Sequence, residues 1–200
     1  MPGRTDELVA VLGRPILEVA PRLLDAVLRH DGVAVRITEV EAYDGAEDPG
    51  SHAFRGPTRR NEVMFGPPGH LYTYFTYGMH HCANVVCGPE GRASAVLLRA
   101  GEVVEGVDLA RSRRRPGPDR DLARGPARLC QALALDLAHN GMPLAGALEL
   151  AAPVDPARVS IGPRVGLRHA PDHPWRFWIT GDPTVSRYVP AKPRKRSSTR

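Results

Sequence analysis

The chain has 200 residues, of which 42 % are hydrophobic and 24 % are charged. This composition is typical of a globular domain with a full apolar core, and it excludes a disordered or fibrous protein. The formal net charge of +5 leaves nucleic acid, an acidic membrane surface and an anionic substrate as candidate partners.

No apolar run is long enough to span a bilayer or to act as a secretory signal, so we expect a cytoplasmic protein without a membrane partner. The cysteines, Cys82, Cys87 and Cys130, are odd in number and lack paired spacing, which argues against a disulfide framework. Residues 191–200 are basic and contain serine and threonine. We therefore expect a single domain over residues 1–190 and a disordered tail behind it.

Two elements are predicted before residue 40. The spacing of apolar residues predicts a helix over residues 21–29, with its proline in the first turn. A half-buried strand follows over residues 33–37, because valine and isoleucine alternate there with alanine and arginine. Continued in register, this strand carries Glu39, Glu41 and Tyr43 on the same side as its valines. Since desolvation disfavours an ionised carboxylate on an apolar face, these glutamates need a functional reason.

Residues 44–68 are rich in glycine, proline, aspartate and arginine and predict a long irregular loop, of a length that is usually functional. Residues 70–87 then predict two strands around a turn near Gly78. On an ideal strand Tyr72 and Tyr74 face one side. Packing within the sheet is the usual explanation for tyrosines on a strand.

The turn of this hairpin places Tyr77 and Met79 on either side of Gly78. A flat ring and a flexible apolar side chain at a hairpin tip, on a basic protein, are typical of a wedge between stacked bases.

The second half of the chain predicts shorter elements. A strand is expected over residues 93–99, and an arginine- and proline-rich connection over 111–124 is either a phosphate-contacting surface or a solvated loop. A helix is expected from Gly125 to about residue 140, followed by short strands near 148–150 and 175–180.

Two groups of side chains are candidates for chemistry. His80, His81 and Cys82 suggest a metal site, but adjacent strand residues point to opposite faces and the usual ligand spacings are missing, so we expect no metal. Glu39 and Glu41 lie about 7 Å apart along a strand. They are either a carboxylate pair for sugar-type chemistry, or one general base with a structural partner.

At this point the chain resembles the alkyladenine (3-methyladenine) DNA glycosylase family, and the resemblance extends from about residue 13 to residue 189. It rests on blocks in the same order and at similar spacing. These blocks are TEVEAY at 38–43, SH at 51–52, RNEVMF at 60–65, GHLYTYFTYGM at 69–79 with Asn84, VLLRA at 96–100, GPARLCQAL at 125–133, PRVG at 163–166 and PWRF at 174–177.

The resemblance implies an α+β fold: a single mixed domain around a curved antiparallel sheet or open barrel, with a protruding hairpin that enters DNA. It implies a monomeric base-excision repair enzyme that acts on double-stranded DNA without cofactor or metal. Its substrates would be alkylated or deaminated purines of the 3-methyladenine, 7-methylguanine, hypoxanthine and ethenoadenine class. The alternative is a non-catalytic nucleic-acid-binding module of related fold, which has no use for a buried acid at Glu41.

The resemblance also implies roles for individual residues. Glu41 matches the general base that activates water, and Arg99 and the carbonyl of Val165 match groups that hold that water. The remaining matches form a base pocket and a DNA contact: Tyr43, His52 and Tyr74 around the flipped base with Asn84 at its edge, Tyr77 in the gap left in the duplex, and Met79 and Arg60 beside it. His52 is also a candidate proton source for neutral bases.

Overall fold

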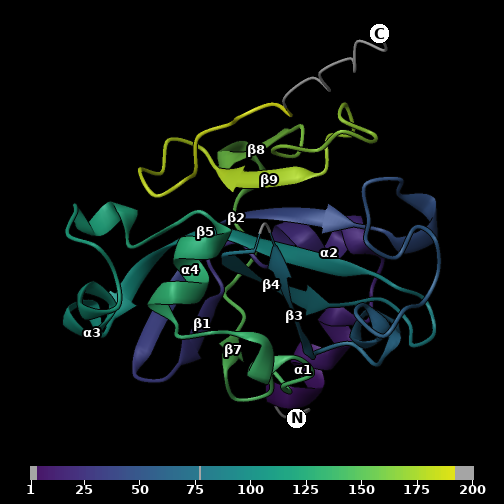
Figure 1. Ribbon diagram of the computed structural model, residues 1–200, viewed down its shortest axis with the longest axis horizontal. Helices are drawn as coiled ribbons and strands as arrows, with labels where there is room; N and C mark the ends of the chain where they lie inside the picture. The colour runs from purple at the N-terminus through teal and green to yellow at the C-terminus, as the bar shows by residue number, and fades with distance from the viewer. Residues whose placement is uncertain (1–3, 77, 192–200) are drawn as a thin grey trace, which may run out of the picture.

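The computed structural model describes residues 4–76 and 78–191 (Figure 1). Its centre is a nine-stranded antiparallel sheet in the order β3–β4–β5–β2–β1–β7, with β6 beside β5, β9 beside β2, and β8 beside β9. The strands are β1 (Val27–His30), β2 (Val33–Tyr43), β3 (Leu71–Thr76), β4 (His80–Val86), β5 (Ala95–Glu105), β6 (Ala123–Arg124), β7 (Leu148–Glu149), β8 (Val159–Gly162) and β9 (Arg176–Ile179).

Four helices accompany the sheet within the described residues, and the expected mixed α+β architecture is confirmed. The helices are α1 (Arg4–Leu12), α2 (Ile16–Arg22), α3 (Val107–Ser112) and α4 (Pro126–Ala132). Among the described strands β3 and β7 end the main path without pairing with each other, so the sheet stays open. In the described part of the chain none of the helices is long and apolar enough to cross a bilayer.

The helix predicted over residues 21–29 is wrong. Helix α2 ends at Arg22, and β1 already begins at Val27. Asp25 has φ +61°, a left-handed conformation that interrupts a helix. Residues 31–32, an Asp-Gly pair with φ +45° and +76°, then form the turn between β1 and β2. The backbone hydrogen bonds of residues 27–30 are therefore made in a hairpin and not in a helix.

The predicted face of the two glutamates is also wrong, because β2 contains a bulge. Ile37 pairs with Gly101, but Glu39 pairs with Ala100, and this register shift leaves Thr38 as an extra residue. Before the bulge the odd-numbered residues of β2 face the core, and after it Val40 and the next even-numbered residue do. The glutamates therefore lie on the opposite face of the sheet from the valines.

The other predicted strands are confirmed, with β5 longer than expected, whereas β1, β6, β8, α1 and α3 were not predicted. The helix expected to run to about residue 140 is wrong, since α4 ends at Ala132 and Ala134 adopts φ +52°. A short 3-10 helix, Leu137–His139, follows.

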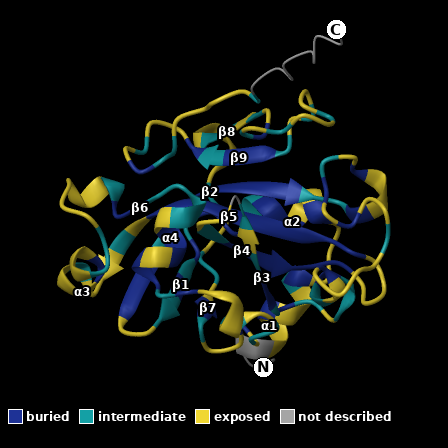
Figure 2. Ribbon diagram, viewed as in Figure 1, coloured by how far each residue is buried: buried dark blue, intermediate teal, exposed yellow. Residues whose placement is uncertain are grey.

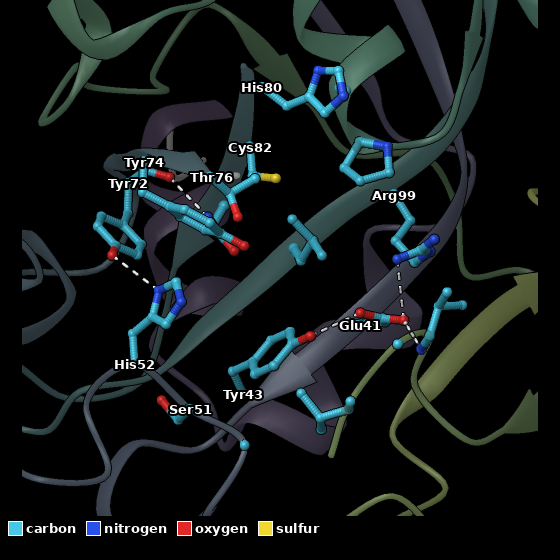
Figure 3. Close-up of a pocket in the computed structure, with 18 of the residues that line it drawn as sticks. Glu41, Tyr43, Ser51, His52, Tyr72, Tyr74, Thr76, His80, Cys82 and Arg99 are labelled. Carbon is cyan, nitrogen blue, oxygen red and sulfur yellow. Dashed lines mark hydrogen bonds and ion pairs between the residues drawn. The ribbon is translucent and has the colours of Figure 1, made fainter. Parts of the chain in front are cut away.

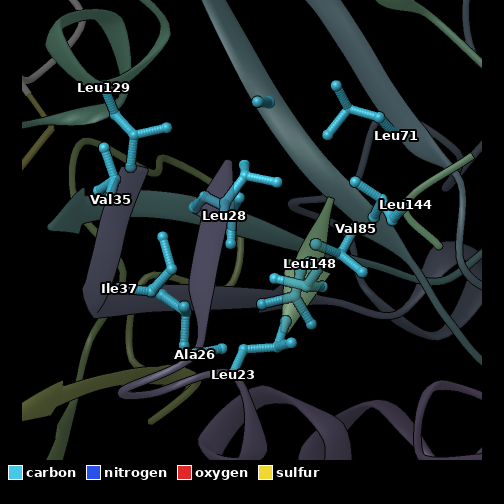
Figure 4. Packing of buried hydrophobic residues seen from close by; sticks show 14 of the residues in the cluster. Leu23, Ala26, Leu28, Val35, Ile37, Leu71, Val85, Leu129, Leu144 and Leu148 are labelled. Atoms are coloured by element: carbon cyan, nitrogen blue, oxygen red, sulfur yellow. The ribbon is translucent and has the colours of Figure 1, made fainter. Parts of the chain in front are cut away.

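The main core lies on the valine face of β1 and β2, where α2, α4 and the short strand β7 contribute apolar side chains (Figure 4). Leu28, Val35 and Ile37 of the hairpin meet Leu129 of α4 and Leu148 of β7 there, and all are buried. The sheet interior is buried while α3 and the long loops are exposed (Figure 2). All three cysteines are buried and free. One face of β2 and β5 therefore packs in the core, and the opposite face carries the candidate active site described below.

Candidate active site

A cavity of about 280 Å³ opens on the face of β2 and β5 that carries the glutamates. Strands β2 to β5 form its floor, while the loop around His52, the start of α4 and the segment after Arg164 complete its rim. It is close to the lower end of the range of small-molecule pockets, about 300–1,000 Å³. Tyrosines and a histidine gather on one side of this cavity, and Glu41 and Arg99 lie on the other (Figure 3).

Glu41 is the acidic group of the cavity. Its side chain is 0 % exposed, and three donors surround it. The phenol of Tyr43 donates to Oε2 over 2.8 Å, and the backbone N–H of Val165 donates to Oε1 over 2.7 Å. Nη1 of Arg99 lies 3.4 Å from Oε1. These contacts fix the carboxylate and compensate for the loss of water around its charge.

Glu39 has a different environment and does not line the cavity. Its Oε1 accepts from Nε of Arg99 over 2.9 Å and from Nε of Arg176 over 2.6 Å. Its Oε2 accepts from the backbone N–H of Ser186 over 2.6 Å. Glu39 therefore holds two buried arginines, and one of them also contacts Glu41. The contacts favour one cavity acid with a structural partner over a matched carboxylate pair.

The aromatic side of the cavity is formed by His52, Tyr72 and Tyr74 (Figure 3). The rings of His52 and Tyr74 meet edge to face with centroids 4.5 Å apart, and those of Tyr72 and Tyr74 are 5.6 Å apart. Nδ1 of His52 is 3.4 Å from the phenol oxygen of Tyr72. As expected from strand alternation, Tyr72 and Tyr74 share one face.

Burial keeps these rings uncharged. It raises the pKa of Tyr72 to about 12, and it raises the pKa of Tyr74 well above its ordinary value. Burial, together with the positive charge of Arg60, lowers the pKa of His52. The aromatic side is thus a neutral surface at physiological pH.

Tyr43 connects the aromatic and acidic parts of the site. Burial and the charge of Glu41 raise the pKa of Tyr43 well above its ordinary value, so its phenol remains a donor. The guanidinium of Arg164 lies over its ring, 4.6 Å from the centroid. Arg164 is itself buried. It donates to Asp48 over 2.7 Å and to the carbonyl of Ala42 over 2.8 Å.

Asn84 lies in the cavity wall opposite Tyr72 in the β3–β4 ladder. Its Nδ2 donates to the carbonyl of Tyr72 over 3.0 Å, which fixes the amide plane. Cys82, His80 and Leu97 line the same cavity and were not predicted as pocket residues.

The predicted DNA contacts lie outside the cavity or outside the described residues. Met79 is 66 % exposed at the hairpin turn. Arg60 donates over 3.0 Å to the carbonyl of Phe75 and places its guanidinium 5.5 Å from the ring centroid of Tyr74. Tyr77, the predicted wedge, lies outside the described residues.

The histidines of β4 are separated as strand geometry requires. His80 lines the cavity, whereas His81 packs against Phe75 with ring centroids 4.9 Å apart. Over the part of the chain that the structure describes, no three His, Cys, Asp or Glu side chains gather as a candidate metal site.

A comparison with known protein families identifies the family to which this chain, and therefore its cavity, belongs. The profile of the methylpurine-DNA glycosylase (MPG) family matches residues 10–183, which include every cavity residue described above. The chain belongs to this family. It is therefore a DNA glycosylase, a hydrolase that acts on N-glycosyl bonds in DNA repair.

Relatives of the glycosylase match it over most of its length. A protein of Streptomyces avermitilis is 57 % identical over 98 % of this chain and 97 % of its own, and one of Leifsonia xyli is 58 % identical over 86 % and 87 %. A Burkholderia cenocepacia protein is 51 % identical over 90 % and 91 %. All three are named "Putative 3-methyladenine DNA glycosylase".

Sequence reasoning missed several residues that shape the site of this glycosylase. Tyr72 could have been found, because it shares a strand face with Tyr74. Arg164 directly precedes Val165 in a matched block, but its partner Asp48 is 116 residues away. Ser186, which donates to Glu39, lies in a segment without a recognisable pattern.

Proposed function

We propose that this glycosylase excises 3-methyladenine and related alkylated or deaminated purines from double-stranded DNA, with Glu41 as the general base. It acts as a monomer in the cytoplasm, on the DNA of the nucleoid. The observation that carries the proposal is the position of Glu41: a fully buried carboxylate at one end of a cavity whose other end is aromatic. The name of a relative suggests 3-methyladenine as the substrate, and the aromatic end of the cavity gives a physical reason why this base would bind.

The aromatic end suits a methylated purine. Alkylation at N3 or N7 leaves the purine ring positively charged, and such a ring is attracted to the faces of tyrosines. The neutral forms of Tyr72, Tyr74 and His52 are suited to this ligand, because none of them repels the cation. Asn84, with its amide held by the Tyr72 carbonyl, is in place to test the edge of the base.

The acidic end of the cavity activates the attacking water. Glu41 takes a proton from water, the water oxygen forms a bond to C1′ of the sugar, and the C1′–N bond breaks to release the base. The donors from Tyr43 and Val165 leave the carboxylate one orientation. Arg99 lies close enough to hold the water or the sugar beside it. In this proposal the Val165 carbonyl contacts the same water.

The damaged nucleotide reaches the cavity only after it leaves the stack, which costs a few kcal/mol and less for a damaged base. We assign the gap it leaves to Tyr77, which lies in the sequence between β3 and β4. Met79 and Arg60 contact the DNA beside it, which fits the exposure of Met79. The hairpin is thus the part of the protein that enters the duplex.

Incubation with duplexes that carry one lesion each, followed by alkaline cleavage at abasic sites, tests this proposal. We expect strand breaks at 3-methyladenine with wild-type protein, formed at least about 100-fold more slowly with Glu41→Gln, which should still bind the lesion duplex. A protein that binds all duplexes and cleaves none is a binding module, and the proposal then fails. Loss of activity in EDTA would instead indicate a metal-dependent hydrolase built on His80, His81 and Cys82.

A further inference from the structure

A second hollow, of about 740 Å³, adjoins the candidate active site. It lies between the hairpin tip, the segment after α3 and the start of α4. Its charged and hairpin residues are Met79, His80, Arg113, Arg114, Arg115 and Arg128. His80 and Ala127 line both this hollow and the base cavity, so the two share a wall.

The arginines of this hollow differ in how their charges are used. Arg113 is fixed by the protein, since it donates over 2.8 Å to the carbonyl of Ala132 and over 2.7 Å to Asp31. The nearby Arg111, outside the hollow, is neutralised by two carboxylates. By contrast, Arg115 has no hydrogen-bond or ion-pair partner among the described residues.

Arg114 and Arg128 are also short of negative partners. Within the described part of the chain, the one acidic partner of Arg128 is Asp121, 3.6 Å away, and Asp121 also pairs with Arg124. Arg114 donates to the side chain of Gln131, while its Nε is buried without a partner in the described structure. Burial and the like charges of Arg128 and Arg115 lower the pKa of Arg114, although Asp121 opposes this effect. The hollow therefore concentrates positive charge that the protein itself does not balance.

We infer that this hollow binds backbone phosphates of the DNA strand that carries the damaged nucleotide, through Arg114, Arg115 and Arg128. The inference rests on the proposed function, because it places the flipped base in the neighbouring cavity. A phosphodiester is attached to the same sugar as that base, so the flanking phosphates lie near the mouth of the cavity, and this hollow adjoins the cavity along His80 and Ala127.

Two features of the hollow suit a phosphate more than another anion. The planar guanidinium of arginine matches phosphate oxygens with paired donors, and the exposed side chains of Arg115 and Arg128 can present such donors. The described lining of the hollow also contains no aspartate or glutamate, so no carboxylate there repels an anion.

Salt-dependent binding tests the inference. The probe is a duplex that contains a tetrahydrofuran abasic analogue, and its dissociation constant is measured by anisotropy between 50 and 300 mM salt. Log affinity falls with log salt, and each lost phosphate contact makes this slope less steep by about 0.9. We expect the slope of the triple variant Arg114→Gln, Arg115→Gln, Arg128→Gln to be less steep than that of wild type by about 2 to 3. Arg14→Gln, in the turn between α1 and α2, removes one charge elsewhere and should keep the wild-type slope.

A second arm identifies the phosphates. Replacing the phosphates on either side of the abasic analogue by neutral methylphosphonates should weaken wild-type binding, with no further loss in the triple variant. Arg128→Lys keeps the charge and should keep the slope, which separates lost contacts from lost folding. A wild-type slope in a folded triple variant would show that this segment is only a solvated loop and would overturn the inference.

Failure of the inference is distinguishable from failure of the proposed function. If wild-type protein releases no base from any lesion duplex, the proposed function fails. If wild-type protein releases 3-methyladenine but the triple variant keeps the wild-type salt slope, only the phosphate assignment fails.

Discussion

Val165 donates its backbone N–H to Oε1 of Glu41 over 2.7 Å, across 124 residues of sequence. The contact ties the proposed general base to a segment that belongs to no strand. Arg164, the preceding residue, anchors that segment through Asp48 and through the ring of Tyr43. Tyr43 in turn donates to the other oxygen of Glu41. The orientation of the Glu41 carboxylate therefore depends on contacts to both of its oxygens, and Arg164 connects the two residues that make them.

The first prediction separates the two glutamates of β2. Glu41→Gln should lower the single-turnover rate of excision by about two orders of magnitude or more, the usual scale for general-base catalysis. The amide oxygen can still accept from Val165 or Tyr43, so the fold should survive. Glu39→Gln should instead lower the free energy of unfolding by about 3–5 kcal/mol, because Arg99 and Arg176 lose their buried counter-charge.

Denaturant unfolding and single-turnover excision on the same two variants check this division. If both variants fold with wild-type stability and are equally inactive, the assignment of one base and one structural partner is wrong.

The two glutamates also show where sequence reasoning succeeds and where it stops. Alternation predicted a strand that leads into them and a hairpin over residues 70–87, because a local period determines which residues share a face. It could not predict the bulge at Thr38, since a bulge depends on register with β5. One extra residue was enough to move both carboxylates to the other side of the sheet.

The strand pattern marked Glu39 and Glu41 as candidate acids, but the roles of the other site residues were predictable only from the resemblance. Glu41, Tyr43, His52 and Tyr74 came from matched blocks, and the structure brings them together around one cavity. Partners that are distant in sequence, such as Asp48 for Arg164, have no local pattern, because only the folded chain brings them together.

The second prediction concerns the buried pair of Arg164 and Asp48. Arg164→Met leaves the carboxylate of Asp48 buried and unpaired, so it should lower the free energy of unfolding by about 3–5 kcal/mol. Adding Asp48→Asn should restore part of this loss, because it removes the stranded charge. The more exposed pair of Arg92 and Asp44 is the control, and Arg92→Met should cost about 0–1 kcal/mol. Equal losses for the two arginine variants in urea unfolding would contradict the proposed difference.

The third prediction tests the hairpin turn. Tyr77→Ala should speed dissociation from the abasic product and lower the flipped population, because nothing then fills the gap in the duplex. Excision from an unpaired lesion should be less affected, since that base has already left the stack. Tyr77→Phe keeps the ring and should behave like wild type. Stopped-flow dissociation from a fluorescent abasic duplex measures the effect, and an unaltered Tyr77→Ala protein would exclude the wedge.

The last prediction follows from the lowered pKa of His52. Burial first, and then the charge of Arg60, depress the pKa below its unfolded value near 6.5. Just below pH 6.5 His52 is therefore protonated in the unfolded chain but still neutral in the folded chain. The free energy of unfolding is highest above this pH and falls as the pH drops. The same shift leaves His52 neutral at pH 7 and makes it a poor proton donor to a neutral base. His52→Gln should lose less stability than wild type between pH 7 and pH 5, whereas His169→Gln, which removes an exposed histidine, should follow wild type. Urea unfolding at several pH values measures this, and parallel curves for wild type and His52→Gln would show that the imidazole is freely protonated in the folded site.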